Sequence, residues 1–408
     1  MRKRTNTKIY KSVILAAVFL LIFSVAAGCS NGKDASIDSG ALDDTVKIGI
    51  YEPLSGADKD AARAETIGIE LAHKLHPSIA GKKIELIYAD NKSDLLHGKL
   101  AAQKLVNEDV DIVLGSYGNI MSMTGGEYFQ KAGIPVIAIT CTNPLVTKGN
   151  TCYFRIGTID SFQAVMAAKY VYNELPADVI AILKQEDDDY GTALAQQFSD
   201  KLVSLAELGN EDPVNIQTEE YDADSEDFKR QLTRIKQSGA KAIYLPCPPE
   251  KAAQIARQAR KLGVDALFIG TDLWHDESFI DEGGEAVEGA VFTDYFDSSA
   301  EIGQKSDEFL SAYRAEYGDE SPDSAVALGF DAYLVALHAM QIQNNLQSVD
   351  NKRVSLCDAL ASVKEYMGVT GSITFDENGD PIKPVVLTTV VEGEFKHCYT
   401  AEPEWNHS

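Results

Sequence analysis

Two polar segments carry residue types that could hold a small anion, and each follows a short apolar run. They contain Asn119, after residues 112–115, and Cys141, Thr142 and Asn143, after residues 136–139. A Gly-, Ser- or Asn-rich turn that leads into a helix offers free N–H groups and the positive end of the helix dipole. Together these hold a carboxylate without a formal cation. For either segment alone, the alternative is that these residues only form a turn and bind no ligand.

An acid and a tyrosine follow two later apolar runs. Asp272 comes after residues 267–270, and Tyr190 precedes Gly191 in a segment that comes after residues 179–183. A carboxylate that faces a cleft is costly unless it is paired, and a ligand ammonium is the natural partner in a substrate site. The alternative role for Asp272 is to cap the next helix.

Motifs of covalent catalysis are absent from the sequence. It contains no G-x-S-x-G, Walker A, H-E-x-x-H or G-x-G-x-x-G element, and its seven histidines are scattered. Only His275, just after a strand end, is a candidate for a functional role among them. We therefore expect no catalytic residues, no metal site, no cofactor and no enzyme activity.

Short β-branched runs alternate with segments whose apolar residues recur at helical spacing, which is typical of βαβ units. The runs are 46–50, 84–88, 111–115 and 135–139, then 179–183, 242–245 and 267–270. Helices are expected between them and over 307–317, 325–343 and 356–367, followed by a β-rich tail from Ile373. The pattern predicts an α/β fold of two doubly wound parallel-sheet lobes, with the later helices returning to the first sheet. Because ligands of such sheets bind at the carboxyl ends of the strands, two facing lobes predict a cleft between two such edges.

The amino-terminal residues predict export and lipid attachment. A basic start precedes an apolar run over 13–23, and the small residues Ala27 and Gly28 then stand directly before Cys29. The run has roughly 11 residues, short of the ~20 that span a bilayer. We expect 1–28 to be a signal peptide, Cys29 to carry a lipid, and 29–44 to be a polar tether, which would anchor the protein to the outer face of the cytoplasmic membrane.

Charge and cysteine content limit the partners. Removal of residues 1–28 takes the formal net charge from -25 to -30, and such an acidic surface argues against nucleic acid and against anionic membrane surfaces as partners. Beyond Cys29 the chain has five cysteines, an odd number that argues against a complete disulfide framework. A Cys141–Cys152 clip is possible by spacing, and the other cysteines are expected to be buried apolar residues.

Several segments in order resemble the branched-chain amino-acid-binding family of ABC-transporter substrate-binding lipoproteins, which have the type I periplasmic-binding-protein fold. The resemblance covers nearly the whole chain after residue 44. Its carriers are 48–50 with 53–56, 115–116, 133–137, 142–147, 153–155, 189–191, Gly289, 368–371 and 375–380.

The resemblance implies two lobes joined by a multi-strand hinge. Lobe 1 would comprise 45–161 and 297–375, and lobe 2 would comprise 162–296 and 376–408. The implied function is a monomeric receptor that closes on an amino acid, branched-chain, otherwise neutral or a close analogue, and delivers it to an ABC permease in the membrane.

The same resemblance assigns site residues. The ligand carboxylate would be held by Asn119, Cys141, Thr142 and Asn143, the ammonium by Asp272, and closure would be assisted by Tyr190. Ala61-Ala62 stands where relatives carry an aromatic-glycine pair, and it brings Lys59 and Arg63 near the cleft mouth. The sequence therefore leaves open a ligand with a larger or an acidic side chain.

Three other functions also stay open at this stage. A receptor of the same fold could bind an amide, urea or organic acid, in which case Asp272 would not meet an ammonium. An exported α/β hydrolase would need a nucleophile or metal cluster. A signalling protein without a small ligand would be consistent with the missing aromatic at Ala61.

Overall fold

The structure, a computed structural model, describes residues 45–175, 178–209, 212–300, 303–319, 321–350 and 355–403. The predicted signal peptide, Cys29 and the predicted tether lie outside the described residues. Residues from Thr45 onward belong to one compact unit.

The first lobe is built on a sheet with the strand order β2-β3-β1-β4-β5-β6. Its strands are β1 (Thr45–Glu52), β2 (Ser78–Ile79), β3 (Lys82–Asp90), β4 (Ile112–Leu114), β5 (Val136–Ala138) and β6 (Tyr153–Arg155). All pair in parallel except β2 with β3. Near-continuous apolar runs such as Ile112–Leu114 are buried on both faces, as expected for a sheet covered by helices on both sides.

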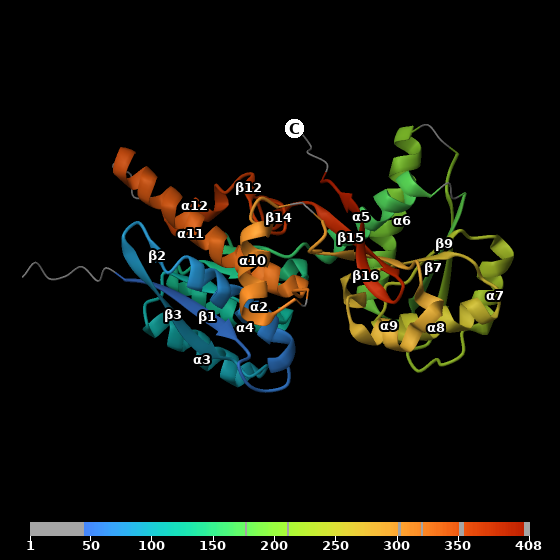
Figure 1. The fold of residues 1–408 in the computed structure, drawn as a ribbon, viewed down its shortest axis with the longest axis horizontal. Coiled ribbons are helices and arrows are strands. Elements are labelled where there is room, and N and C mark those ends of the chain that lie inside the picture. The colour runs from blue at the N-terminus through green and yellow to red at the C-terminus, as the bar shows by residue number, and fades with distance from the viewer. Residues whose placement is uncertain are drawn as a thin grey trace, which may run out of the picture. The chain divides into compact units, whose positions relative to one another are not determined.

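Helices from two distant parts of the chain cover the two faces of this sheet (Figure 1). They are α2 (Lys59–Leu75), α3 (Leu95–Asn107), α4 (Asn119–Ala132), α10 (Ser306–Tyr317), α11 (Ser324–Asp350) and α12 (Leu356–Ala361). One core joins Ile48 and Ile50 of β1 to Phe330 of α11, whereas the core on the other face holds Ala102 of α3 and Phe129 of α4. The prediction that the later helices return to the first sheet is therefore confirmed. Helix α11 is long and apolar enough to cross a membrane by length and composition, but most of it is buried inside this lobe.

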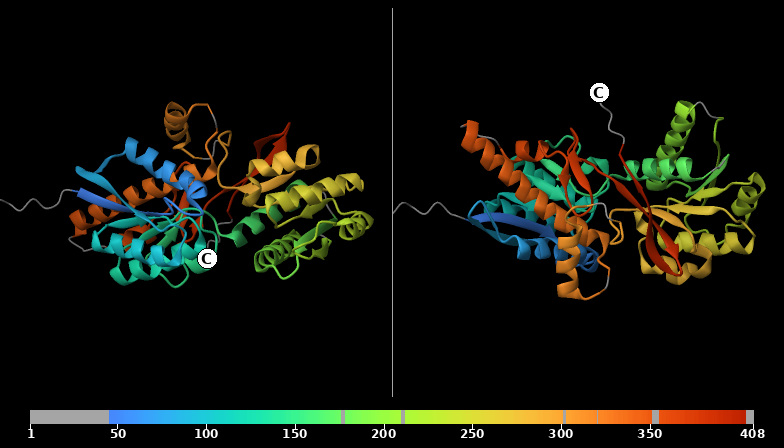
Figure 2. Two further views of the ribbon diagram at one scale, coloured as in Figure 1. Left: turned by 90° about the horizontal axis from the view of Figure 1, so that it is seen from below. Right: turned by 45° about the horizontal axis from the view of Figure 1, so that its top comes forward.

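The second lobe repeats the architecture around a sheet with the order β16-β15-β11-β10-β9-β7-β8. Its strands are β7 (Val179–Gln185), β8 (Asn215–Tyr221), β9 (Ala242–Tyr244), β10 (Leu267–Gly270), β11 (Val291–Asp294), β15 (Val385–Val391) and β16 (Glu394–Ala401). Its helices are α5 (Asp160–Glu174), α6 (Asp189–Gly209), α7 (Lys229–Ser238), α8 (Pro249–Lys261) and α9 (Glu277–Gly283), with the short turns η2 (Asp272–Trp274) and η3 (Gly284–Val287). Separate cores on the two faces pack α5 and α6 on one side and α7, α8 and α9 on the other (Figure 2).

Three chain segments connect the two sheets: β6 to α5, β11 to α10, and β14 (Pro381–Ile382) to β15. Strand β14 belongs to a small sheet with β12 (Tyr366–Met367) and β13 (Ser372–Phe375). The turn η1 (Pro144–Val146) precedes β6. The two parallel-sheet lobes expected from the sequence are confirmed, while the exact lobe boundaries stay a prediction.

Local predictions failed where the apolar pattern was weak. Strand β8 carries the sequence NIQTEEY and lies at the sheet edge half exposed, so it lacks the apolar run of a central strand. The helix predicted over 356–367 ends at Ala361, and Tyr366–Met367 pairs with β13 as strand β12 instead.

The cysteine predictions need correction. Cys152 is joined to Cys357 at a Cα–Cα distance of 5.0 Å, whereas Cys141 is free and buried. The Cys141–Cys152 clip that the spacing allowed does not form, and the expectation that Cys357 is a buried apolar residue is wrong. Cys247 is buried as expected, but Cys398 is exposed on β16. The two bridged cysteines lie in parts of the chain that only the fold brings together.

The disulfide should contribute substantially to stability because its cysteines are 205 residues apart in sequence. Closing so long a loop restricts the unfolded chain, and loss of a native disulfide in an exported protein typically costs about 2–5 kcal/mol. We expect Cys152→Ser with Cys357→Ser to lower the free energy of unfolding by that amount in denaturant titrations. Cys398→Ser is the matched control and should change it by less than about 0.5 kcal/mol.

Candidate functional site

The carboxyl ends of four neighbouring strands in the second sheet converge on one group of polar side chains. Tyr244 ends β9, Asp272 follows β10, Tyr295 follows β11, and Tyr190 lies in the first turn of α6 after β7. Because β11, β10, β9 and β7 are adjacent in the sheet, residues far apart in the sequence meet at this edge. Two of the four, Tyr190 and Asp272, were predicted from sequence.

Asp272 ends a chain of buried hydrogen bonds. Thr293 donates to Oε1 of Gln163 at 2.8 Å, Nε2 of Gln163 donates to the Tyr295 hydroxyl at 3.0 Å, and that hydroxyl donates to Oδ2 of Asp272 at 2.8 Å. These three hydrogen bonds fix the orientation of the Asp272 carboxylate. No cationic side chain of the described residues pairs with Asp272, which leaves it available to a positively charged ligand.

A second carboxylate, Asp160 at the start of α5, adds negative charge to the same group. Burial raises the pKa of Asp272 to about 7, opposed by the Tyr295 hydrogen bond and reinforced by the charge of Asp160. Burial likewise raises the pKa of Asp160 to about 6, opposed by a hydrogen bond from the Thr142 side chain. Sequence reasoning missed Asp160, because an acid in the first turn of a helix is expected there for the helix dipole alone.

These raised pKa values predict opposite pH effects on binding and on stability. A cationic ligand needs the ionised carboxylates, so its affinity should rise as the pH increases from 5 to 8. Without ligand, the protonated acids stabilise the fold below their unfolded pKa, and this contribution is lost as pH rises through about 6 to 7. Thermal unfolding from pH 5 to pH 8, with and without ligand, should therefore show the largest ligand-induced shift at pH 8.

Tyr190 lies against both acids. Burial raises the pKa of its hydroxyl well above the usual value, and the charges of Asp272 and Asp160 raise it further. The hydroxyl therefore stays protonated at any physiological pH and can donate a hydrogen bond. Burial and the same two charges also raise the pKa values of Tyr244 and Tyr295, so three phenols surround the two carboxylates.

His275, the one histidine not dismissed from the sequence, pairs with Asp294 at the end of β11. Burial lowers the pKa of His275, but the Asp294 carboxylate more than offsets this and raises it to about 9. The imidazolium is therefore neutralised inside the protein and is not a candidate partner for a ligand anion.

Asn119 holds together the two polar segments of the first lobe. It is the first residue of α4, and its Oδ1 accepts hydrogen bonds from the backbone N–H of Thr142 and of Asn143, each at 3.1 Å. Both of the backbone donors expected for a ligand carboxylate are therefore engaged in this structure. The Nδ2 of Asn119, which donates to no other described residue, is the side-chain group left to meet a ligand, beside a helix whose N-cap, Gly118, supplies no side chain.

The other predicted first-lobe residues face the protein. The Cys141 thiol is buried within 3.0 Å of the Ser122 hydroxyl and the Ser116 carbonyl oxygen, and burial raises its pKa to about 12. Oδ1 of Asn143 accepts from the N–H of Leu145 at the start of η1. The side chains of Cys141 and Asn143 thus shape the loop.

Arg155 holds the loop that contains Cys141 and Asn143 through its backbone. Its guanidinium donates to the carbonyl oxygens of Cys141 at 3.0 Å and Asn143 at 2.9 Å, and its Nε lies 2.6 Å from Oδ1 of Asp380. The side chain is fully buried. Because its charge is neutralised by Asp380, Arg155 serves as a positioning residue rather than as an anion-binding cation.

The basic residues suggested by the sequence do not change the charge of this region. Lys59 and Arg63 are exposed on α2, whereas the described groups around Asp272 are carboxylates and phenols. The arrangement therefore favours a ligand that carries a positive charge at this edge of the second sheet.

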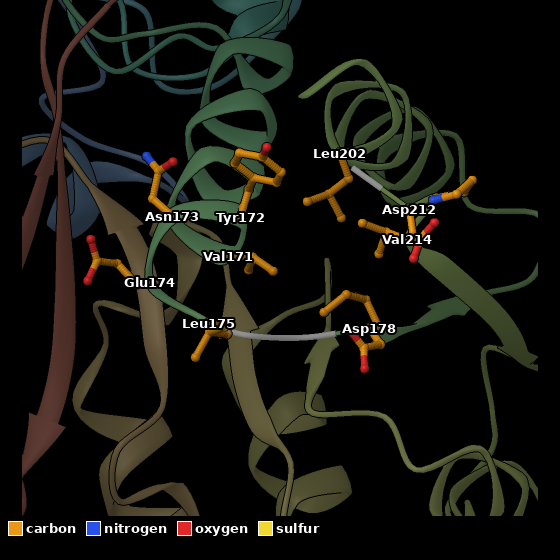
Figure 3. Close-up of a pocket in the computed structure, with 11 residues that line it drawn as sticks. Val171, Tyr172, Asn173, Glu174, Leu175, Asp178, Leu202, Asp212 and Val214 are labelled. Carbon is orange, nitrogen blue, oxygen red and sulfur yellow. The ribbon is translucent and has the colours of Figure 1, made fainter. Parts of the chain in front are cut away.

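A cavity of about 740 Å³ lies elsewhere in the second lobe, between α5, α6 and the segment before β8 (Figure 3). Val171 and Tyr172 of α5, Leu202 of α6 and Val214 line it, together with Asp178 just before β7. It lies at the amino end of β7 and beside the segment that leads into β8, whereas ligands of open α/β sheets bind at the carboxyl ends. It contains none of the predicted site residues. Within the described ranges no group of three or more His, Cys, Asp or Glu side chains is placed to hold a metal ion.

Comparison with known proteins places this geometry in context. A family model described as periplasmic binding protein matches residues 45–394. The Leu/Ile/Val-binding protein homolog 2 of Brucella abortus is 28% identical over 358 residues, which cover 86% of this chain and 91% of that protein. The Leu/Ile/Val-binding protein of Escherichia coli is 26% identical over 344 residues, covering 83% of this chain and 89% of its own.

Solved structures give the same result. A leucine-binding protein from Thermotoga maritima superposes with a TM-score of 0.71 at 28% identity, covering 88% of this chain and 99% of that one. A branched-chain amino acid transporter substrate-binding protein from Streptococcus pneumoniae was solved with isoleucine. It gives a TM-score of 0.68 at 28% identity, and the match covers 88% of this chain and 100% of that one. The chain belongs to the periplasmic binding protein family.

Proposed function

We propose that this protein is the extracytoplasmic receptor of an ABC importer and that it binds an amino acid, with neutral branched-chain ligands first among the candidates. Curated relatives that match along most of their length are named for leucine, isoleucine and valine. A receptor of this kind performs no covalent chemistry, which agrees with a site built from hydrogen-bonding groups on two lobes.

Asp272 carries the proposal. It is a buried acid at the carboxyl end of β10, it is oriented by Tyr295, and no described cation neutralises it. A ligand ammonium supplies the missing charge, and Tyr190 lies beside it to donate a further hydrogen bond. On the first lobe, Asn119 Nδ2 and the first turn of α4 supply donors for a carboxylate.

Closure of the two lobes would explain several exposed apolar side chains. Leu54, Ile120 and Leu145 follow β1, β4 and β5, and Leu273 follows β10, with exposed fractions between 41% and 62%. All four follow the carboxyl ends of strands, the edges between which the ligand is expected. Burial of these side chains around a ligand that contacts both lobes would favour a closed state, since only differential binding shifts such an equilibrium.

A thermal-shift screen of the refolded, ligand-free protein tests this function. A ligand at 100 times its dissociation constant stabilises the protein by about 2.7 kcal/mol. We expect shifts with neutral L-amino acids and none with benzoate, urea or acetamide. A shift with an organic acid or amide, and with no amino acid, would keep the fold and contradict the assigned role of Asp272.

We further propose that Cys29 carries a lipid that tethers the protein outside the cytoplasmic membrane and that the receptor acts as a monomer beside its permease. The Cys152–Cys357 disulfide supports export, because disulfides persist in oxidising compartments. Expression of Cys29→Ser should release the protein from the membrane fraction into the soluble extracytoplasmic fraction. Retention of the variant in the membrane would contradict the lipid anchor.

A further inference from the structure

Two fully buried glutamates lie beneath the first-lobe ligand loops and have no role in the site described above. Glu52 ends β1, and Glu65 lies on α2; both are 0% exposed. Oε2 of Glu52 accepts a hydrogen bond from the backbone N–H of Tyr117 at 2.8 Å. Oε1 of Glu65 accepts one from the Thr140 hydroxyl. Each glutamate therefore holds one of the two polar loops.

One oxygen of each carboxyl group has no donor. Oε1 of Glu52 and Oε2 of Glu65 have no hydrogen-bond partner among the described residues, and the charge of Glu65 acts on Glu52. Two carboxyl groups that share a buried site do not both ionise readily, and they can bond to one another only when one of them carries a proton. Burial and the neighbouring Glu65 raise the pKa of Glu52 well above its ordinary value, whereas burial raises that of Glu65 to about 7. Burial and mutual repulsion therefore favour a pair that retains a proton.

No cation of the described residues acts on the pair to replace that proton. The ionisable groups that interact electrostatically with the pair are Tyr51 on β1, Tyr117 after β4, Cys141 after β5 and Asp323 before α11, and all of them are acids. The loop after β4 also packs closely against Glu52, because a Cβ at Gly115 would lie 2.2 Å from Oε1 of Glu52.

We propose that the proton shared by Glu52 and Glu65 couples the two ligand loops of the first lobe, so that its loss at alkaline pH displaces them and weakens ligand binding. This inference rests on the proposed function, because it concerns the regulation of the same site. The Tyr117 loop leads directly into Asn119, and Thr140 directly precedes Cys141 and Thr142. A second negative charge in this closed space repels the first, and separation of the two carboxylates moves both loops.

Glu52→Gln is the decisive variant. The glutamine carbonyl can accept from the Tyr117 N–H, and its amide can donate to Glu65, so it reproduces the protonated acid and cannot ionise. Calorimetric titration with L-leucine at pH 6.5 and pH 9.5 measures the effect. We expect equal affinities at pH 6.5, and at pH 9.5 an affinity about tenfold higher for Glu52→Gln than for the unaltered protein.

Comparison at each pH removes the titrations that both proteins share, namely those of the ligand ammonium, Asp272 and His275. Glu85→Gln, an exposed substitution on β3 of the same lobe, is the matched control and should follow the unaltered protein. Equal loss of affinity in Glu52→Gln and the unaltered protein between pH 6.5 and 9.5 would overturn the inference.

A ligand-independent measurement separates this inference from the proposed function. The unfolding midpoint of the unliganded, unaltered protein should fall relative to that of Glu52→Gln as the pH rises from 6.5 to 9.5, since stability supplied by a raised pKa is lost through that pKa. If this difference appears but no amino acid binds, the proposed function fails and the coupling of the pair stands. If amino acids bind but the two midpoints change in parallel, the inference fails alone.

Discussion

Replacement of Asp272 by asparagine is expected to weaken amino-acid binding by about 2–5 kcal/mol, a loss of roughly 30-fold or more in affinity. The substitution keeps the shape of the side chain and a hydrogen-bond acceptor for Tyr295, but it removes the negative charge that the ligand ammonium meets. Calorimetric titration with L-leucine measures the loss directly. Asp281→Asn, at an exposed acid on α9 of the same lobe, is the control and should bind like the unaltered protein.

The pH dependence of Asp272→Asn provides a second criterion. The increase in affinity from pH 5 to pH 8 that depends on ionisation of Asp272 should be absent, leaving only the contribution of Asp160. Unchanged affinity with an unchanged pH profile would show that Asp272 does not contact the ligand ammonium.

Replacement of Arg155 by methionine is expected to lower the free energy of unfolding by about 3–5 kcal/mol, because it leaves the buried Asp380 carboxylate without its charged partner. The carbonyl oxygens of Cys141 and Asn143 lose their donors as well. Urea titration measures the change, and Arg230→Met at an exposed arginine of α7 is the control, expected within about 0.5 kcal/mol. A loss below about 1 kcal/mol would mean that the ion pair is not needed to hold this loop.

The sequence was most informative where side-chain patterns repeat along a single element. Buried parallel strands such as Ile112–Leu114 read as short apolar runs because both faces are covered. The polar edge strand Asn215–Tyr221 has no such signature, since half of its side chains meet solvent. The two-lobe fold could therefore be predicted, but not every strand.

The candidate site was predictable only in part, because several of its members act through tertiary contacts. Asp272 and Tyr190 follow strand ends and could be found by that rule. Asp160 belongs to the group only because the start of α5 lies beside the ends of β10 and β11. Asn119 was expected to bind the ligand, whereas its Oδ1 is engaged by two backbone amides in the next loop.

Long-range pairings gave no local signal at all. Cys152 and Cys357 are 205 residues apart, so spacing suggested only the nearer Cys141 as a possible partner, and Cys141 is in fact free, buried and hydrogen-bonded. The Glu52–Glu65 pair is similar: each glutamate lies in an ordinary strand or helix, and only the packing of α2 on β1 buries the two in the same region.

Calorimetry with L-leucine and two truncated analogues, 4-methylpentanoate and 3-methylbutylamine, tests the central claim most directly. The first analogue lacks the ammonium that Asp272 should bind, and the second lacks the carboxylate expected at Asn119 and α4. The account predicts that only L-leucine binds tightly and that 4-methylpentanoate loses at least as much affinity as Asp272→Asn does. Binding of 4-methylpentanoate as tight as that of L-leucine would contradict recognition of an amino acid by this site.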